Sequence, residues 1–360
     1  MFRKLLFLNG LSILVIPIQH AAAYGLSAMF EWTDRYMPVE VPNFDQLWSP
    51  EYIFLSALRI LSTFSVPCFL FISGFFIAFM ARGKAQELKV RTLLPRIVTL
   101  LYPFMIWTFA RFVLLRRLPR SVDDFLTPYN FVPLLMQFYF LSPFLVGWAR
   151  RNWKTLLAAT GVIQLVLASS RYLLGLGVEF TMAANVLDNS PRWFFLSSQI
   201  FWFPFGIVYG LNFPQFNAFI LKHRRKWGIG MLVFGAITLA EYFLVDFLTG
   251  PEWIGPNFSG ISRLAFILMT LLMMLSIEPG GFKYSKQISD IGGKSLGIYL
   301  ANIPFIFVVA VFMYWFTPAL LGIQVIYFLV LFTAGLFGPL ALMWLVRKTS
   351  LRAGYRYLFG

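Results

Sequence analysis

Residues 53–80 read IFLSALRILSTFSVPCFLFISGFFIAFM and contain one charged side chain, that of Arg59. A helix needs roughly 20 mostly apolar residues to cross a hydrocarbon layer about 30 Å thick, so this stretch is long enough to span a membrane. Similar stretches recur from Leu5 to Val346 with little polar sequence between them. The sequence therefore predicts an all-α, polytopic bundle of transmembrane helices.

The composition agrees with this prediction. Apolar residues make up 59% of the 360 residues and charged residues 12%, about half the share that is usual in a soluble domain. The net charge of +15 lies in short clusters between apolar runs, which is typical of membrane topology and gives no reason to expect a nucleic-acid partner. Cys68 is the only cysteine, so neither an intramolecular disulfide nor a thiolate metal cluster is possible, and no metal is expected.

The apolar runs predict about ten spans in the cell membrane, with both chain ends in the cytoplasm. The predicted spans are 5–26, 53–80, 93–115, 131–148, 155–176, 196–212, 228–248, 263–277, 293–316 and 319–346. We expect residues 1–346 to form one domain and residues 347–360 a short basic cytoplasmic tail. Alternate connections carry the basic clusters that define the cytoplasmic side: Arg3 and Lys4; Arg82, Lys84, Lys89 and Arg91; Arg150, Arg151 and Lys154; Lys222, Arg224, Arg225 and Lys226; Lys283 and Lys286; and Arg347, Lys348, Arg352 and Arg356.

The connections on the opposite side are mostly acidic or neutral. Arg116, Arg117 and Arg120 are the exception, and they lie beside Asp123 and Asp124. The first of these connections, residues 27–52, is long, aromatic and acidic. It suits either a plain tether or a lid that faces carbohydrate.

An ionisable group within an apolar run costs several kcal/mol unless it meets a partner or water, and His20 is the most informative example. On an ideal helix Asn9, Ser12 and His20 share one stripe, with Asn9 and His20 roughly 16 Å apart along the axis. A neutral imidazole there suits a general base, because its ordinary pKa lies near neutrality. The alternative is an interfacial histidine bonded to a loop carbonyl.

Other charged residues have two interpretations each. Arg59, about a turn and a half inside the far boundary, either extends to the interface or binds a substrate oxygen. Lys89, Arg91 and Arg96 either anchor the third span or hold a phosphorylated ligand from the cytoplasm. We assign the remaining charges near span ends to interface anchoring: Arg111, Arg171, Glu179 and Arg263.

Four segments taken together resemble the acyltransferase 3 family of multi-span membrane acyltransferases. They are FLNGLSILVIPIQH at 7–20, FSVPCFLFISGFF at 64–76, KVRTLLPR at 89–96 and GGKSLGIYLANIP at 292–304. Their order and spacing cover nearly the whole chain. The sequence departs from the family pattern at Asn9, where the family usually has arginine, at the reduced pair Lys89 and Arg91, and at Asn302, where histidine is common.

The resemblance implies a membrane O-acyltransferase that takes an acyl group, most often acetyl, from cytoplasmic acyl-CoA and places it on a hydroxyl of an exported carbohydrate or glycolipid. It implies that His20 is the catalytic base. It also implies that Lys89 and Arg91, with Arg96 beside them, bind the acyl-CoA phosphates. Residues predicted to contact the acceptor are Asn9, Ser12, Arg59, Tyr299 and Asn302.

A carrier or flippase for a glycolipid or small organic acid is the alternative, because transporters also place polar residues inside the membrane. One titratable group near the outer face and cations at the inner face favour acyl transfer over alternating access. A noncatalytic scaffold in polysaccharide assembly is a third interpretation.

Overall fold

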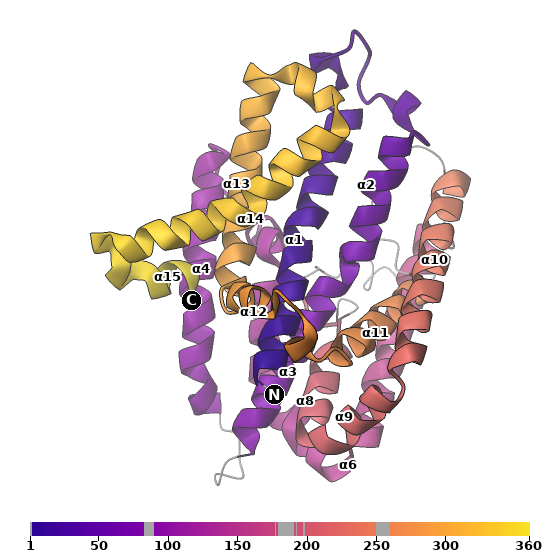
Figure 1. The fold of residues 1–360 in the computed structure, drawn as a ribbon, viewed down its shortest axis with the longest axis vertical. Helices are drawn as coiled ribbons and strands as arrows, with labels where there is room; N and C mark the ends of the chain where they lie inside the picture. Colours follow the sequence, from indigo (N-terminus) through magenta and orange to yellow (C-terminus); the bar gives the residue numbers. More distant parts are fainter. Residues whose placement is uncertain are drawn as a thin grey trace.

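The computed structural model describes residues 2–82, 90–176, 178, 191, 193–196, 199–249 and 260–360, and these residues form helices and turns without a β-strand. Figure 1 shows the helices as an elongated bundle. The α-helices are α1 Phe2–Phe30, α2 Pro50–Leu61, α3 Ser65–Ala81, α4 Val90–Leu114, α5 Val122–Leu126, α6 Phe131–Gly175, α8 Trp202–Leu211, α9 Phe213–Lys222, α10 Arg224–Thr249, α11 Ile261–Leu275, α12 Ser285–Gly292, α13 Ser295–Phe316, α14 Gln324–Lys348 and α15 Tyr355–Phe359. The 3-10 turns used below are η1 Thr33–Arg35, η3 Ser62–Phe64, η4 Thr127–Tyr129, η6 Pro318–Gly322 and η7 Ser350–Gly354.

The all-helical membrane prediction is confirmed at the level of the helices, whereas the count of ten spans is not. Within the described ranges, 7 helices are long and apolar enough to cross a membrane, and α8 and α11 are shorter apolar helices. The predicted spans 131–148 and 155–176 correspond to the two helical parts of the 45-residue element α6, which meet at Asn152, where the backbone is not helical. The orientation of the two chain ends stays a prediction.

Helix α1 is the central element of the bundle. It packs against α2, α3, α12, α13 and α14, and it runs from the end that carries the N terminus to the opposite end (Figure 1). We call these the amino end and the far end of the bundle. This position brings the polar residues of α1 next to segments that are distant in the sequence.

Glycines allow the closest helix contacts. A Cβ atom on Gly10 would lie 2.0 Å from the carbonyl oxygen of Ile288, and one on Gly292 would lie 2.0 Å from that of Leu6. The helices α3 and α8 meet in the same way at Gly74 and Gly206. Small residues at these positions therefore let the helix backbones approach closely.

The long connection 27–52 is packed onto the far end of the bundle. Arg35 donates hydrogen bonds to the Tyr314 carbonyl oxygen, at 3.3 Å from Nε and 3.1 Å from Nη2, and stacks on the Tyr314 ring. Trp32 contacts the same ring edge-on, with centroids 5.4 Å apart. The connection therefore packs against the end of α13. A contact of this connection with carbohydrate stays a prediction.

The basic chain end lies along α4. Trp107 Nε1 donates a 2.8 Å hydrogen bond to the Leu358 carbonyl oxygen, and Arg356 Nη2 donates one of 3.1 Å to Thr99 Oγ1. Residues 347 and 348 complete α14, and η7 and α15 follow. The segment predicted as a tail is thus attached to the bundle.

Candidate active site

The interior of the bundle contains His20 on α1. Other residues surround it closely, although the residue as a whole is not completely buried. The ring makes no hydrogen bond with any residue that the structure describes. A bond to a loop carbonyl, the alternative interpretation, is therefore not what this structure has.

Arg59 is the charged group that acts on His20. It lies in the last turn of α2, directly before the break at η3. Polar side chains produce this break, because Thr63 Oγ1 donates to the Ile60 carbonyl oxygen at 2.7 Å and Ser65 Oγ to that of Ser62 at 3.0 Å. The positive charge of Arg59 and the imidazole of His20 thus share one polar region.

Beyond His20 lies a second set of polar groups that the sequence analysis did not connect. Tyr24 follows His20 by four residues on α1, so both face the same side of the helix, about 6 Å apart along its axis. The charge of Arg111 on α4 acts on Tyr24 and on Tyr129 of η4. Tyr299 on α13 contacts Tyr129 edge-on, with ring centroids 6.2 Å apart.

Several of these polar atoms have no partner. Within the described residues, Arg111 Nη1 and the hydroxyls of Tyr129 and Tyr327 are buried without a hydrogen bond. A buried polar group without a partner costs about 1–3 kcal/mol, so such groups generally meet water or a ligand. The assignment of Arg111 to interface anchoring does not account for a buried guanidinium nitrogen.

The other predicted acceptor residues on α1 are engaged in packing. Asn9 Nδ2 donates hydrogen bonds of 2.7 Å to the Gly292 carbonyl oxygen and to Ser295 Oγ, which join α1 to the segment 292–304. Ser12 is fully buried, and its Oγ donates to the Leu8 carbonyl oxygen at 3.0 Å. The structure therefore brings His20 and Arg59 together and places Asn9 and Ser12 in helix contacts.

Asn302 and Tyr299 lie on α13. Asn302 is fully buried and its Nδ2 donates to the carbonyl oxygens of Ile298 and Tyr299, while its Oδ1 has no partner among the described residues. Tyr299 is buried and belongs to the tyrosine set around Arg111. A contact of either residue with substrate stays a prediction.

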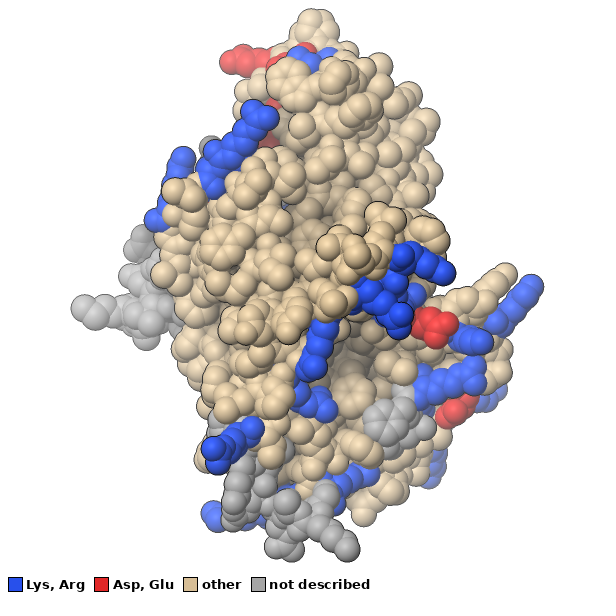
Figure 2. Space-filling view, turned by 90° about the vertical axis from the view of Figure 1, so that its left-hand side faces the viewer, with Lys and Arg blue, Asp and Glu red and all other residues tan. Residues whose placement is uncertain are grey.

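The predicted donor residues lie at the start of α4, at the amino end. Arg91 and Arg96 are exposed, and the Arg96 guanidinium reaches the hydroxyl of Tyr139. Lys89 lies outside the described residues, as does Glu179. On the face that carries α4 and α15, basic side chains gather around a hollow (Figure 2). This grouping of cations is compatible with a phosphorylated ligand.

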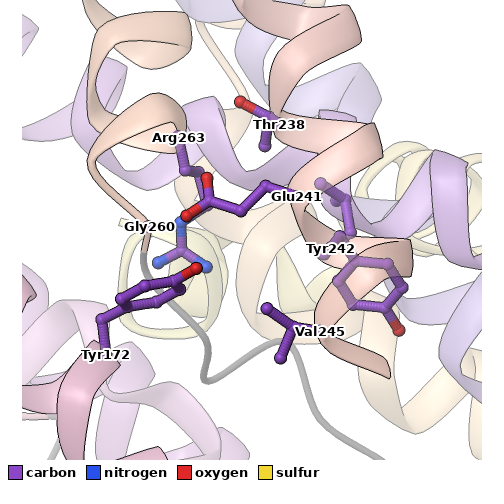
Figure 3. A pocket seen from close by; sticks show the side chains of 8 residues that line it. Tyr172, Thr238, Glu241, Tyr242, Val245, Gly260 and Arg263 are labelled. Carbon is purple, nitrogen blue, oxygen red and sulfur yellow. The ribbon is translucent and has the colours of Figure 1, made fainter. Parts of the chain in front are cut away.

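A further polar pocket lies between α6, α10 and α11. It is a small pocket that is partly open to the exterior. In Figure 3 the Arg263 guanidinium, the Glu241 carboxylate and the Tyr172 hydroxyl turn toward one another. Tyr242 lines the same pocket and is near Arg59, so the pocket adjoins the His20 region.

These observations define a class of protein: a multi-span membrane protein with one imidazole in its interior and two half-buried arginines among the polar groups on either side of it. A family model described as an acyltransferase domain matches residues 8–348. The chain therefore belongs to the acyltransferase 3 family and is a membrane acyltransferase in general terms. Comparison with curated proteins and with solved structures gave no match.

Proposed function

We propose that the protein is a membrane O-acyltransferase that moves an acyl group, namely acetyl, from cytoplasmic acyl-CoA to a hydroxyl of an exported or surface carbohydrate or glycolipid. One observation carries the proposal: His20 is an interior imidazole that makes no hydrogen bond with any described residue and lies within electrostatic range of Arg59. Membership of the acyltransferase family supplies the general reaction class.

His20 acts as the general base. Its unprotonated nitrogen accepts the proton of the acceptor hydroxyl as the oxygen attacks the thioester carbonyl carbon. The tetrahedral intermediate then collapses, the carbon–sulfur bond breaks, and the CoA thiolate takes the proton from the imidazolium. A thioester is already activated, so alignment of two substrates and transfer of one proton are the main tasks of the protein.

The donor enters from the amino end of α4. Arg91 and Arg96 pair with the phosphates of acyl-CoA, for which planar guanidinium groups are well suited. Arg96 and Arg111 lie about 22 Å apart along α4, so the thioester has to reach inward from the cation cluster. The flexible arm that joins the CoA nucleotide to its thioester allows this.

The proposal is tested with purified protein in lipid nanodiscs, labelled acetyl-CoA and an envelope-glycan extract. We expect label in the glycan fraction, lost by at least about a hundredfold in His20→Ala. His223→Ala is the matched control, because His223 is the other histidine and lies outside the interior. Undiminished transfer by His20→Ala would overturn the mechanism.

A second assay separates the alternatives. In sealed vesicles, movement of a labelled glycolipid across the bilayer without acylation would replace the proposal with a carrier. Absence of both transfer and movement, in protein that remains folded, would favour a scaffold. Release of CoA that requires the glycan extract would support acyl transfer.

A further inference from the structure

Arg111 is a half-buried cation at the far end of the bundle, and no acid among the described residues forms an ion pair with it. Its Nη1 is buried and bonds to none of the residues that the structure describes. The carboxylate within its electrostatic range is Asp124, and that group is already engaged. Arg117 donates two hydrogen bonds of 2.8 Å to Asp124, and these bonds hold the pKa of Asp124 below its ordinary value.

Tyrosine hydroxyls surround the same position. Tyr129 and Tyr327 are fully buried, and neither hydroxyl has a partner within the described ranges. Tyr24 is near both rings and near Arg111. Four segments, α1, α4, η4 and α14, therefore contribute polar groups that lie within electrostatic range of Tyr24 or include it.

The chemistry of this set favours an anion. A guanidinium only donates hydrogen bonds, and a tyrosine hydroxyl donates one readily to a charged oxygen. Among the described residues, two unpartnered hydroxyls and an unpartnered guanidinium nitrogen provide at least three donors. Asp124, which is engaged by Arg117, is not available to neutralise the Arg111 charge. A carboxylate or a phosphate satisfies all three, whereas a neutral sugar hydroxyl accepts fewer bonds and leaves the charge unpaired.

The region lies next to the proposed catalytic base. Tyr24 is one helical turn beyond His20 on the same face of α1. A ligand whose anionic group meets Arg111 and the tyrosines can thus place a neighbouring hydroxyl beside the imidazole.

We propose that Arg111, Tyr24, Tyr129 and Tyr327 bind the carboxylate or phosphate of an anionic acceptor and position its hydroxyl at His20. The part that places the hydroxyl at His20 rests on the proposed acyltransferase function. Binding of the anion itself does not, so the two are tested separately.

The test measures ligand-dependent thermal stabilisation of purified protein in nanodiscs. The probes are methyl glucuronide, glycerol 1-phosphate and the neutral methyl glucoside, compared at equal ionic strength. We expect at least one anion to bind about tenfold or more tightly than methyl glucoside. The preferred anion identifies the source as carboxylate or phosphate. Equal binding of all three probes would overturn the proposal.

Two variants locate the site. Arg111→Gln is expected to weaken anion binding by about tenfold to a hundredfold, while Arg116→Gln, an exposed control just beyond the same end of α4, leaves it unchanged. Tyr129→Phe removes a hydroxyl that bonds to no described residue, so it should fold as well as the parent protein and still lose anion affinity. Unchanged affinity in Tyr129→Phe, or in a folded Arg111→Gln, would contradict the site.

His20→Ala distinguishes the two proposals. It should retain anion binding and lose acyl transfer. Anion binding without transfer in the parent protein would refute the acyltransferase mechanism and leave the anion site intact. Transfer to neutral acceptors with no anion preference would refute the anion site alone.

Discussion

Substitution of Gly292 by alanine tests the closest contact of the central helix. The added methyl carbon would lie 2.0 Å from the Leu6 carbonyl oxygen, whereas ordinary contacts begin near 3.4 Å. The backbones of α1 and α12 therefore have to separate by about 1.4 Å. Neither side of this contact is a flexible side-chain end, so local adjustment cannot relieve it.

The expected cost follows from two effects. Overpacking of a tight contact costs about 1–3 kcal/mol. The separation also lengthens the two 2.7 Å hydrogen bonds from Asn9 Nδ2 to the Gly292 carbonyl oxygen and Ser295 Oγ, each worth about 0.5–1.5 kcal/mol. We expect Gly292→Ala to destabilise the folded protein by about 3 kcal/mol.

The neighbouring glycine is the matched control. A Cβ atom on Gly293 would lie 3.6 Å from the Asp290 carbonyl oxygen, which is an ordinary contact, and its backbone is right-handed helical with φ −67°. Heating of both variants in detergent, followed by size-exclusion chromatography, measures the loss of folded protein. Gly292→Ala should lose its folded peak at a clearly lower temperature than Gly293→Ala. Equal temperatures would refute the close-contact argument.

Three further variants test other contacts. Asn9→Ala removes two hydrogen bonds between helices, so it should lower thermal stability by about 1–3 kcal/mol without a selective rise in acceptor KM; a selective rise would show that Asn9 binds acceptor. Tyr52→Phe leaves the buried Asp246 carboxylate without its tyrosine donor and should lower the free energy of unfolding by about 1.5–3 kcal/mol. The double variant Tyr52→Phe/Asp246→Asn should regain part of this stability. A double variant no more stable than Tyr52→Phe would contradict the argument. Arg96→Gln should raise the KM for acetyl-CoA about tenfold, whereas Arg116→Gln at the far end should not; equal effects would argue against a donor site at the start of α4.

Recognition of the interior site from sequence was partial. A lone histidine in an apolar run indicates a polar interior whatever the fold, because exposure of an imidazole to hydrocarbon is costly. The same argument applied to Arg111, near the end of the run 93–115, but interface anchoring explains most arginines at such positions. The available signal for Tyr24 was its spacing of four residues from His20.

Helix lengths were less well determined. The run 196–212 was predicted as a full span, and the structure has the 10-residue helix α8 there. Similarly, the run 53–80 was predicted as one span, and the structure divides it at η3, where hydroxyls bond to the backbone. Local propensity does not decide such boundaries, because neighbouring helices determine which backbone groups can be satisfied by other partners.

The sequence by itself determined that this protein lies in a membrane and is helical, because apolar runs of sufficient length have to satisfy their own backbone hydrogen bonds there. Four short segments in order also indicated its family. Tertiary structure alone decided which polar residues meet. Asn9 and Ser12 share a helix stripe with His20, yet packing against α12 and burial engage both of them. Arg111 and Tyr129 come near Tyr24 from other segments, because the approach of helices in space, and not their periodicity, determines which buried donors share a site.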